Sequence, residues 1–192
     1  MSIQNQPTIY NAPSVYKLGA GVSNANVVKV DGIEYEFVRI GNRYYTTENL
    51  KNLFTGSLEL NGDFSGASCR WFENNEAQAK TNKYNLAYTI NALDVIDSLL
   101  DDGWRVNTYS DIMYLQSFGL GYKFCAWKSN DCGLSFVQNG NGNTDGLSWF
   151  NVGNSGALRT RERCVSINND GDINEGNVVN RWAAVRLVKD VS

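Results

Sequence analysis

The sequence predicts an α+β domain in which two helices precede a loop-rich antiparallel sheet. Three observations predict it: strand-length runs of alternating polarity near both ends of the chain, helical spacing between them, and loops rich in asparagine, glycine and aspartate in the C-terminal half. With 192 residues, of which 42% are hydrophobic and 19% charged, the chain can form one folded domain with a sizeable core and some appended peptide.

Residues 1–28 are predicted to form an extended arm, and residues 29–192 the folded domain. The segment 8–21 has one charge, a proline and scattered apolar residues without a period, so it cannot bury a face by itself. A disordered tail is the ordinary interpretation of such a terminus. We expect instead that the arm docks on a partner, because its apolar side chains are costly to leave in water. These side chains are Ile9, Tyr10, Val15, Tyr16 and Leu18.

Strand signals flank the predicted helices on both sides. Residues 27–40 alternate in polarity around Asp31 and Gly32, a pair typical of tight hairpin turns. A glycine–asparagine pair then turns the chain into a further strand at 43–47. A last strand is expected at 182–188, so that the terminal strands of the domain could pair.

Two segments have helical spacing. Apolar residues recur every three or four positions over 86–100, and the sequence Asp-Asp-Gly at 101–103 ends the run. A second, shorter helix is expected to begin at Ser110, a favourable N-cap. The side chains expected to face inward from it are Ile112, Leu115 and Phe118.

Composition excludes several classes of protein. The chain has no histidine, which removes Ser-His-Asp and Cys-His catalytic groups and zinc sites with imidazole ligands. A net charge of -3, with the basic cluster at 159–163 interrupted by Glu162, argues against a nucleic-acid partner. No apolar stretch reaches the roughly 18 residues that a membrane-spanning helix needs. Because no secretory signal is recognisable either, we expect the chain to fold in a cytoplasm.

The four cysteines have no CxxC spacing and therefore form no metal knuckle. In a reducing compartment, Cys69, Cys125, Cys132 and Cys164 are expected to be buried free thiols. The alternative is a disulfide between Cys125 and Cys132 that closes a small hairpin loop after release into an oxidising medium.

Five motifs occur in a fixed order within residues 33–190. They are IGNRYYTTENL at 40–50, YNLAYT at 84–89, GWRV at 103–106 with SDIMYL at 110–115, SWF at 148–150 and VRLVKD at 185–190. In this order they resemble the motifs of the Fibrobacter succinogenes major paralogous domain, a bacterial branch of the C-type-lectin-like fold. The resemblance implies a C-type-lectin-like domain in which Trp104 and Trp182 pack in the core. Leu187 stands where the family has a cysteine, which counts against a family disulfide.

The same fold includes formylglycine-generating oxidases, which use a pair of cysteines in the C-terminal half for copper-dependent oxidation. The sequences flanking Cys125, Cys132 and Cys164 do not match that pair. We therefore expect no enzyme activity, no cofactor and no metal, and an oxidase-like enzyme remains the remote alternative.

One loop resembles a calcium ligand set. Residues 170–176 alternate oxygen-bearing side chains, as this cation requires. Counted from Asp170, however, Glu175 and Arg181 occupy the places where an EF-hand has glycine and glutamate. We expect an Asx-rich turn here, with a long-loop calcium site as the alternative.

Candidate ligand-binding residues lie in the loop-rich C-terminal half. Aromatic side chains beside amides suit stacking on sugar rings or contacts with protein, although packing in the core is the alternative. The arginines at 159, 161 and 163 alternate, which predicts either a solvated strand edge or a surface for an acidic partner. The candidates are Trp127, Trp149, Phe150, Asn151, Arg159, Arg161, Asn168, Asp170 and Asp172.

The arm adds a second resemblance. Its IYNAPSVYKLGAG sequence at 9–21 is similar to N-terminal segments of phage head-fibre and other virion proteins, which implies an anchor to a capsid. We therefore expect a bacteriophage virion protein, a capsid fibre, decoration or tail-associated adhesin, assembled in the host cytoplasm. Its expected partners are other virion proteins, further copies of itself, and a host surface protein or glycan. The alternative is a bacterial cell-surface or secreted adhesin of the same fold.

Overall fold

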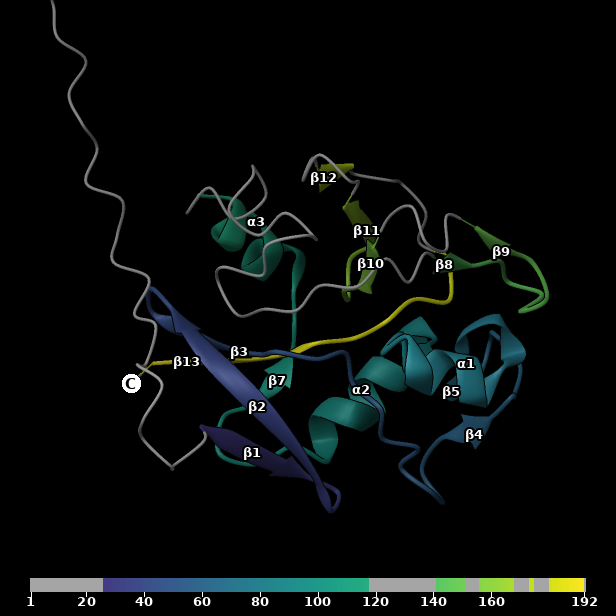
Figure 1. Ribbon diagram of the computed structural model, residues 1–192, viewed down its shortest axis with the longest axis horizontal. Coiled ribbons are helices and arrows are strands. Elements are labelled where there is room, and N and C mark those ends of the chain that lie inside the picture. The colour runs from purple at the N-terminus through teal and green to yellow at the C-terminus, as the bar shows by residue number, and fades with distance from the viewer. Residues whose placement is uncertain (1–25, 118–140, 151–155, 168–172, 175–179, 192) are drawn as a thin grey trace, which may run out of the picture.

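The computed structural model describes residues 26–117, 141–150, 156–167, 173–174 and 180–191 (Figure 1). The arm and several loop segments lie outside these ranges. Within the described residues the chain forms three α-helices and several mostly antiparallel sheets, so the α+β prediction is confirmed. No helix in these ranges is long and apolar enough to cross a membrane.

The largest sheet has five strands and curls into a half-barrel. In spatial order its strands are β1 (Val27–Val30), β2 (Ile33–Ile40), β3 (Arg43–Thr46), β13 (Leu187–Asp190) and β7 (Arg105–Val106), all antiparallel. The predicted hairpin is confirmed, because Asp31 and Gly32 join β1 to β2 with positive φ values of 43° and 80°. Positive φ at both central residues is the geometry of a type I′ turn, which matches the twist of the flanking strands.

The predicted helix at 86–100 begins too early. Leu86–Tyr88 forms strand β6, which pairs with β5 (Ser68–Trp71), and helix α2 runs only over Ile90–Ser98. Thr89 caps it, accepting a hydrogen bond from the Ala92 N–H at 3.3 Å. The spacing of apolar residues at 86–88 is compatible with either a helix or a strand. Pairing with β5 makes these three residues a strand.

The expected N-cap of the second long helix is also wrong. Helix α3 runs over Tyr109–Ser117, and its cap is Thr108 rather than Ser110. The Thr108 hydroxyl accepts from the Asp111 N–H at 3.2 Å, while the Asp111 carboxylate accepts from the Thr108 N–H at 2.7 Å. This reciprocal pair is a capping box with aspartate in place of glutamate. Ile112 and Leu115 are buried as predicted, and Phe118 lies outside the described residues.

The remaining elements are short. They are β4 (Glu59–Leu60), the 3-10 turn Phe72–Asn74, α1 (Glu76–Thr81), β8 (Asn141–Gly142), β9 (Trp149–Phe150), β10 (Gly156–Arg159), β11 (Cys164–Ile167) and β12 (Ile173–Asn174). The strand expected at 182–188 is regular only from Leu187, because residues 182–184 make isolated bridges to Tyr88, Gly142 and Leu158. These bridges connect the small sheets to one another.

Trp104 and Trp182 lie in the core, as predicted. Trp104 is 8% exposed and its ring meets that of Phe37 edge-on at 5.3 Å. Trp182 is fully buried against Phe64, with ring centroids 5.6 Å apart. Both tryptophans therefore contribute packing rather than an accessible surface.

Candidate functional site

The hairpin formed by β8 and β9 carries two of the candidate aromatic residues. Trp149 is half-buried, with its ring 4.9 Å from that of Phe72, so it takes part in packing. Phe150 is 41% exposed, and the Arg181 guanidinium lies 4.6 Å from its ring centroid. Leu147, in the connecting turn, is 77% exposed. The hairpin therefore presents apolar groups to solvent beside the Arg181 cation, a combination suited to contacts with protein.

The sequence predicted that the three alternating arginines share one exposed strand face, and this prediction is wrong. Arg159 ends β10 and is fully buried, because the chain turns immediately afterwards: the Thr160 N–H bonds to the Arg163 carbonyl at 2.9 Å. Arg161 is exposed and forms ion pairs with two carboxylates of α2, at 2.5 Å from Asp94 and also with Asp97. Because the turn breaks the alternation, the three side chains have separate environments.

Several candidates lie outside the described residues. They are the loop residues Trp127, Asn151, Asn168, Asp170 and Asp172, the cysteines Cys125 and Cys132, and the arm residues Ile9, Tyr10, Val15, Tyr16 and Leu18. In the described ranges, no group of three or more cysteine, aspartate or glutamate residues is arranged to hold a metal ion. Cys69 and Cys164 are buried free thiols, as expected, and burial raises the pKa of each to about 11.

A network of ion pairs that sequence analysis did not identify joins the start of α3 to the five-stranded sheet. The Asp111 carboxylate, 1% exposed, lies 2.9 Å from the Arg43 guanidinium and 2.5 Å from that of Arg105. Asp190 contacts the same two arginines at 3.2 and 3.4 Å from the solvent side. Burial alone would raise the pKa of Asp111, but the hydrogen bonds from Arg105 and Thr108 outweigh it and lower the pKa below its ordinary value. A carboxylate that accepts this many bonds is a poor base, so its role is structural.

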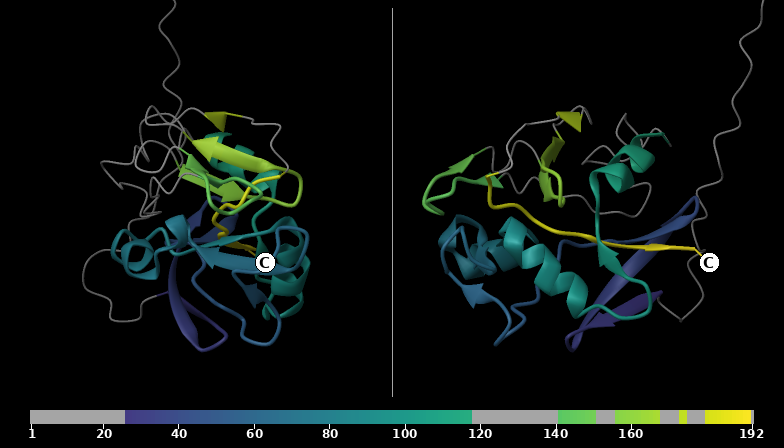
Figure 2. Two further views of the ribbon diagram at one scale, coloured as in Figure 1. Left: turned by 90° about the vertical axis from the view of Figure 1, so that its right-hand side faces the viewer. Right: turned by 180° about the vertical axis from the view of Figure 1, so that it is seen from behind.

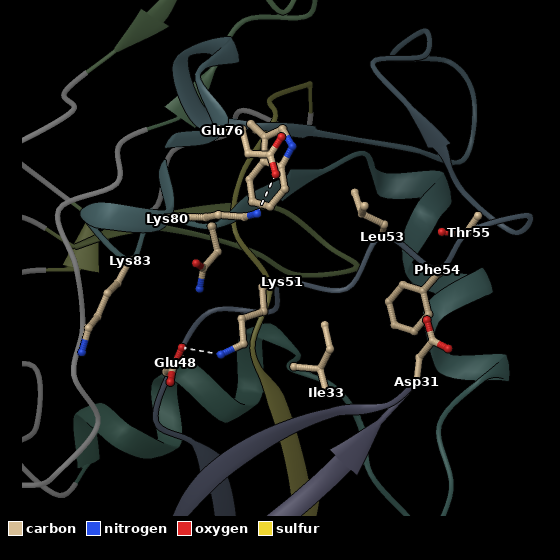
Figure 3. Close-up of a pocket in the computed structure, with 12 residues that line it drawn as sticks. Asp31, Ile33, Glu48, Lys51, Leu53, Phe54, Thr55, Glu76, Lys80 and Lys83 are labelled. Atoms are coloured by element: carbon tan, nitrogen blue, oxygen red, sulfur yellow. Dashed lines mark hydrogen bonds and ion pairs between the residues drawn. The ribbon is translucent and has the colours of Figure 1, made fainter. Parts of the chain in front are cut away.

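A pocket of about 590 Å³ opens between the β1–β2 turn, the segment 48–55 and helix α1 (Figure 3). This volume lies within the roughly 300–1,000 Å³ typical of small-molecule sites. None of its residues was predicted as a site from the sequence, because they come from segments far apart in the chain. The lining residues are Asp31, Ile33, Glu48, Lys51, Leu53, Phe54, Thr55, Trp71, Glu76, Lys80, Lys83 and Asn85.

The pocket has a charged side and an apolar side. Figure 3 places Lys80 and Lys51 on one side, with Lys83 at the rim and its side chain pointing outward, and Leu53, Phe54 and Asp31 on the other side. Two of the lysines are neutralised by neighbours, with 3.1 Å between Lys51 and Glu48 and 2.6 Å between Lys80 and Glu76. Such a division favours a ligand that is itself apolar at one end and charged at the other.

Four residues of the pocket have positive φ: Asp31, Phe54, Lys83 and Asn85, at 43°, 45°, 57° and 61°. Aspartate and asparagine adopt this conformation readily, whereas a bulky aromatic does so at a cost of order 1–3 kcal/mol. Phe54 keeps it because its side chain is buried and its carbonyl accepts from the Ser57 N–H at 2.8 Å and the Leu58 N–H at 3.1 Å. The wall around Phe54 is therefore fixed by the fold before any ligand arrives.

Comparisons with protein-family models, curated proteins and solved structures find no match to this chain.

Proposed function

We propose that the protein is a non-enzymatic adhesive module of a bacteriophage particle, a capsid fibre, decoration or tail-associated protein. In this proposal the N-terminal arm docks on other virion proteins and the folded domain faces outward. The loop-rich side of the domain then binds a host surface protein or glycan. Several copies on one particle would convert weak individual contacts into firm attachment.

The observation that carries the proposal is where the arm and the loops attach to the described part of the domain. Strand β1, at whose start residues 1–25 attach, lies on one side of β13, and β8–β12 with α3 lie on the other (Figures 1 and 2). Residues 118–140, 151–155, 168–172 and 175–179 are connected to these upper elements. A protein that is anchored at one end and binds at the other needs this separation, because docking must leave the binding face free.

The finer proposal for the fold is a C-type-lectin-like domain. Its support is the order of elements: a β-hairpin, then the two longer helices α2 and α3, then short strands between loops, with a last strand that returns to the first hairpin. The pairing of β13 with β3, in which Lys189 faces Tyr44, brings the two ends of the domain together. The motifs at 40–50 and 185–190 therefore meet in one sheet.

The arm provides the direct test. In a phage that carries this gene, deleting residues 1–25 should leave the domain folded, because it retains Asn26, whose carbonyl accepts from the Phe37 N–H at 2.9 Å. Mass spectrometry of purified particles should find the full chain and not the truncated one. A matched pair of arm variants supplies the control: Tyr10→Ser with Tyr16→Ser should reduce incorporation, and Gln4→Ser with Asn5→Ser, outside the segment 9–21, should not.

Two results would overturn the proposal. Incorporation of the truncated chain at the normal copy number would show that the arm is not the anchor. Absence of the full chain from particles, together with its presence in the envelope of a bacterial source, would favour the alternative of a cell-surface adhesin.

A further inference from the structure

The pocket of Figure 3 contains none of the residues on which the proposed function depends, so its ligand can be inferred separately. Its apolar surface is mainly aliphatic. Ile33 and Leu53 are half-buried and reachable from solvent, whereas Phe54 and Trp71 lie beneath the surface. The Lys80 ammonium also lies 5.0 Å from the Trp71 ring centroid and covers that face. The pocket therefore has no open aromatic face on which a sugar ring could stack, but it does offer an apolar wall.

Some of the charged side chains around the pocket have a partner of opposite charge, and others do not. Lys51 and Lys80 each have a glutamate partner, whereas Lys83 is exposed and makes no ion pair with any described residue. Asp31, at the opposite end in Figure 3, has no lysine or arginine partner within the described residues either. The lysine side therefore carries the excess positive charge, and the Asp31 end repels a second negative charge.

The position of Lys83 in the backbone is unusual for a lysine. It follows α1 and its Asn82 cap, and its φ of 57° belongs to the left-handed region that glycine normally occupies after a helix. Its N–H bonds to the Lys80 carbonyl at 3.1 Å, which glycine would do equally well. Helix termination thus favours glycine here, and the lysine side chain is not explained by the fold.

From this arrangement we propose that the pocket binds a small amphipathic anion. One anionic headgroup, a carboxylate, sulfonate or phosphate, lies at the rim beside Lys80 and Lys51, and the exposed Lys83 side chain turns inward to meet it. An apolar body fills the rest of the pocket against Ile33, Leu53 and the wall around Phe54. Anions with charge at both ends are excluded, because their second charge would approach Asp31.

A pair of fluorescent probes tests the headgroup and the apolar body separately. Anilinonaphthalene sulfonate has both, and N-phenylnaphthylamine has nearly the same ring system without the charge. With the native full-length protein, the sulfonate should bind at one site per chain and more tightly than the neutral probe. Loss of one exposed cation should weaken the affinity for the sulfonate probe by about fivefold.

Four variants give the proposal a specific signature. Lys83→Gly should keep or raise the melting temperature, weaken the sulfonate probe and leave the neutral probe unchanged. Leu53→Ser should weaken both probes. Glu76→Gln, which removes the partner of Lys80, should tighten the sulfonate probe. Lys29→Gln removes a lysine from the exposed face of β1, outside the pocket, and should change neither.

The opposite results overturn the proposal. They are the absence of stoichiometric binding in the native protein, equal affinity for the two probes, or sulfonate binding that Lys83→Gly and Leu53→Ser leave unchanged. A loss with Lys29→Gln equal to that with Lys83→Gly would show attraction to overall charge rather than to this pocket. None of these outcomes bears on incorporation into particles, so the two proposals fail independently.

Discussion

The five-stranded sheet and the small sheets of the C-terminal half are stabilised in different ways. In the first, β2 pairs with β3 over four residues, and the buried Arg186 guanidinium bonds to the Thr46 and Thr47 carbonyls at 3.0 Å. In the second, β8 and β9 have two residues each, and the bridge between Gly142 and Trp182 holds them to the rest. Longer backbone ladders and a buried arginine thus position the first region, whereas a two-residue ladder and an isolated backbone bridge position the hairpin of β8 and β9.

The difference indicates how one domain can combine a fixed frame with a region that tolerates substitution. Substitutions in the five-stranded sheet should act cooperatively on the whole fold, because each strand there completes its neighbours. Substitutions around β8 and β9 should have smaller effects, because few backbone hydrogen bonds depend on them. The three predictions that follow test this contrast, from the largest expected effect to the smallest.

The largest contrast is expected between two tryptophans. Trp104→Ala should lower the free energy of unfolding by about 3–5 kcal/mol, because it removes a buried ring and leaves a cavity beside Phe37. Trp149→Ala should cost less, because Trp149 is only half-buried. Urea denaturation followed by circular dichroism measures both. Equal, small losses would remove the distinction between the two regions and would count against the proposed lectin-like fold.

The second prediction concerns Asp111, which joins α3 to the five-stranded sheet. Asp111→Ala should cost about 3 kcal/mol, because it removes a helix cap and leaves Arg43 and Arg105 without their buried partner. Asp190→Ala is the control: its side chain is 65% exposed on the same two arginines, so its loss should cost under about 1 kcal/mol.

The pH dependence of that prediction has a definite sign. Folding lowers the pKa of Asp111, so its contribution is complete above the unfolded pKa of about 3.9 and is lost as the pH falls through the lower, folded pKa. The difference in unfolding free energy between the native protein and Asp111→Ala should therefore be constant from pH 7 to about pH 5 and shrink below about pH 4. A difference that already shrinks near neutral pH would contradict the assignment.

The smallest effect is expected at Arg161, an exposed arginine whose ion pairs with α2 join it to the exposed Asp94 and the partly buried Asp97. Arg161→Ala should cost less than about 1 kcal/mol, and the cost should decrease further in high salt. Arg159→Ala, two residues earlier but fully buried, should cost clearly more. Denaturation of both variants at low and high salt decides whether the turn after β10 separates the two arginines energetically as it does in space.

Much of the fold was predictable where local chemistry determines it. Asp31-Gly32 specifies a tight turn because both residues tolerate positive φ, and the hairpin formed as expected. The start of α3 was harder, since Thr108 and Ser110 are both good caps and only the bond from Thr108 to Asp111 selects the first. Leu86 was predicted to be helical from the local spacing of apolar residues. In the structure it pairs with Trp71 of β5, and a pairing between two separate segments cannot be recognised from local spacing.

The candidate sites depended even more on tertiary structure. The arginines at 159, 161 and 163 appear as an alternating run, and the turn at Thr160 that separates them carries no glycine, proline or asparagine. The pocket could not be predicted, because it combines the residue after a helix, Lys83, with a turn and an irregular segment. The left-handed φ of Lys83 could not serve as a signal, because helix α1 before it was not predicted from the sequence.

Strand β13 lies between β3 and β7 rather than at an edge of the sheet, although it is the last strand in the chain. Arg186, just before it, bonds to Asn49, 137 residues earlier. During synthesis, β3 and β7 are therefore complete long before the strand that separates them leaves the ribosome. Until then both strands have open edges that can pair with another chain. Contacts this distant along the chain slow folding, so a chaperone that covers these edges would favour the native sheet over aggregates.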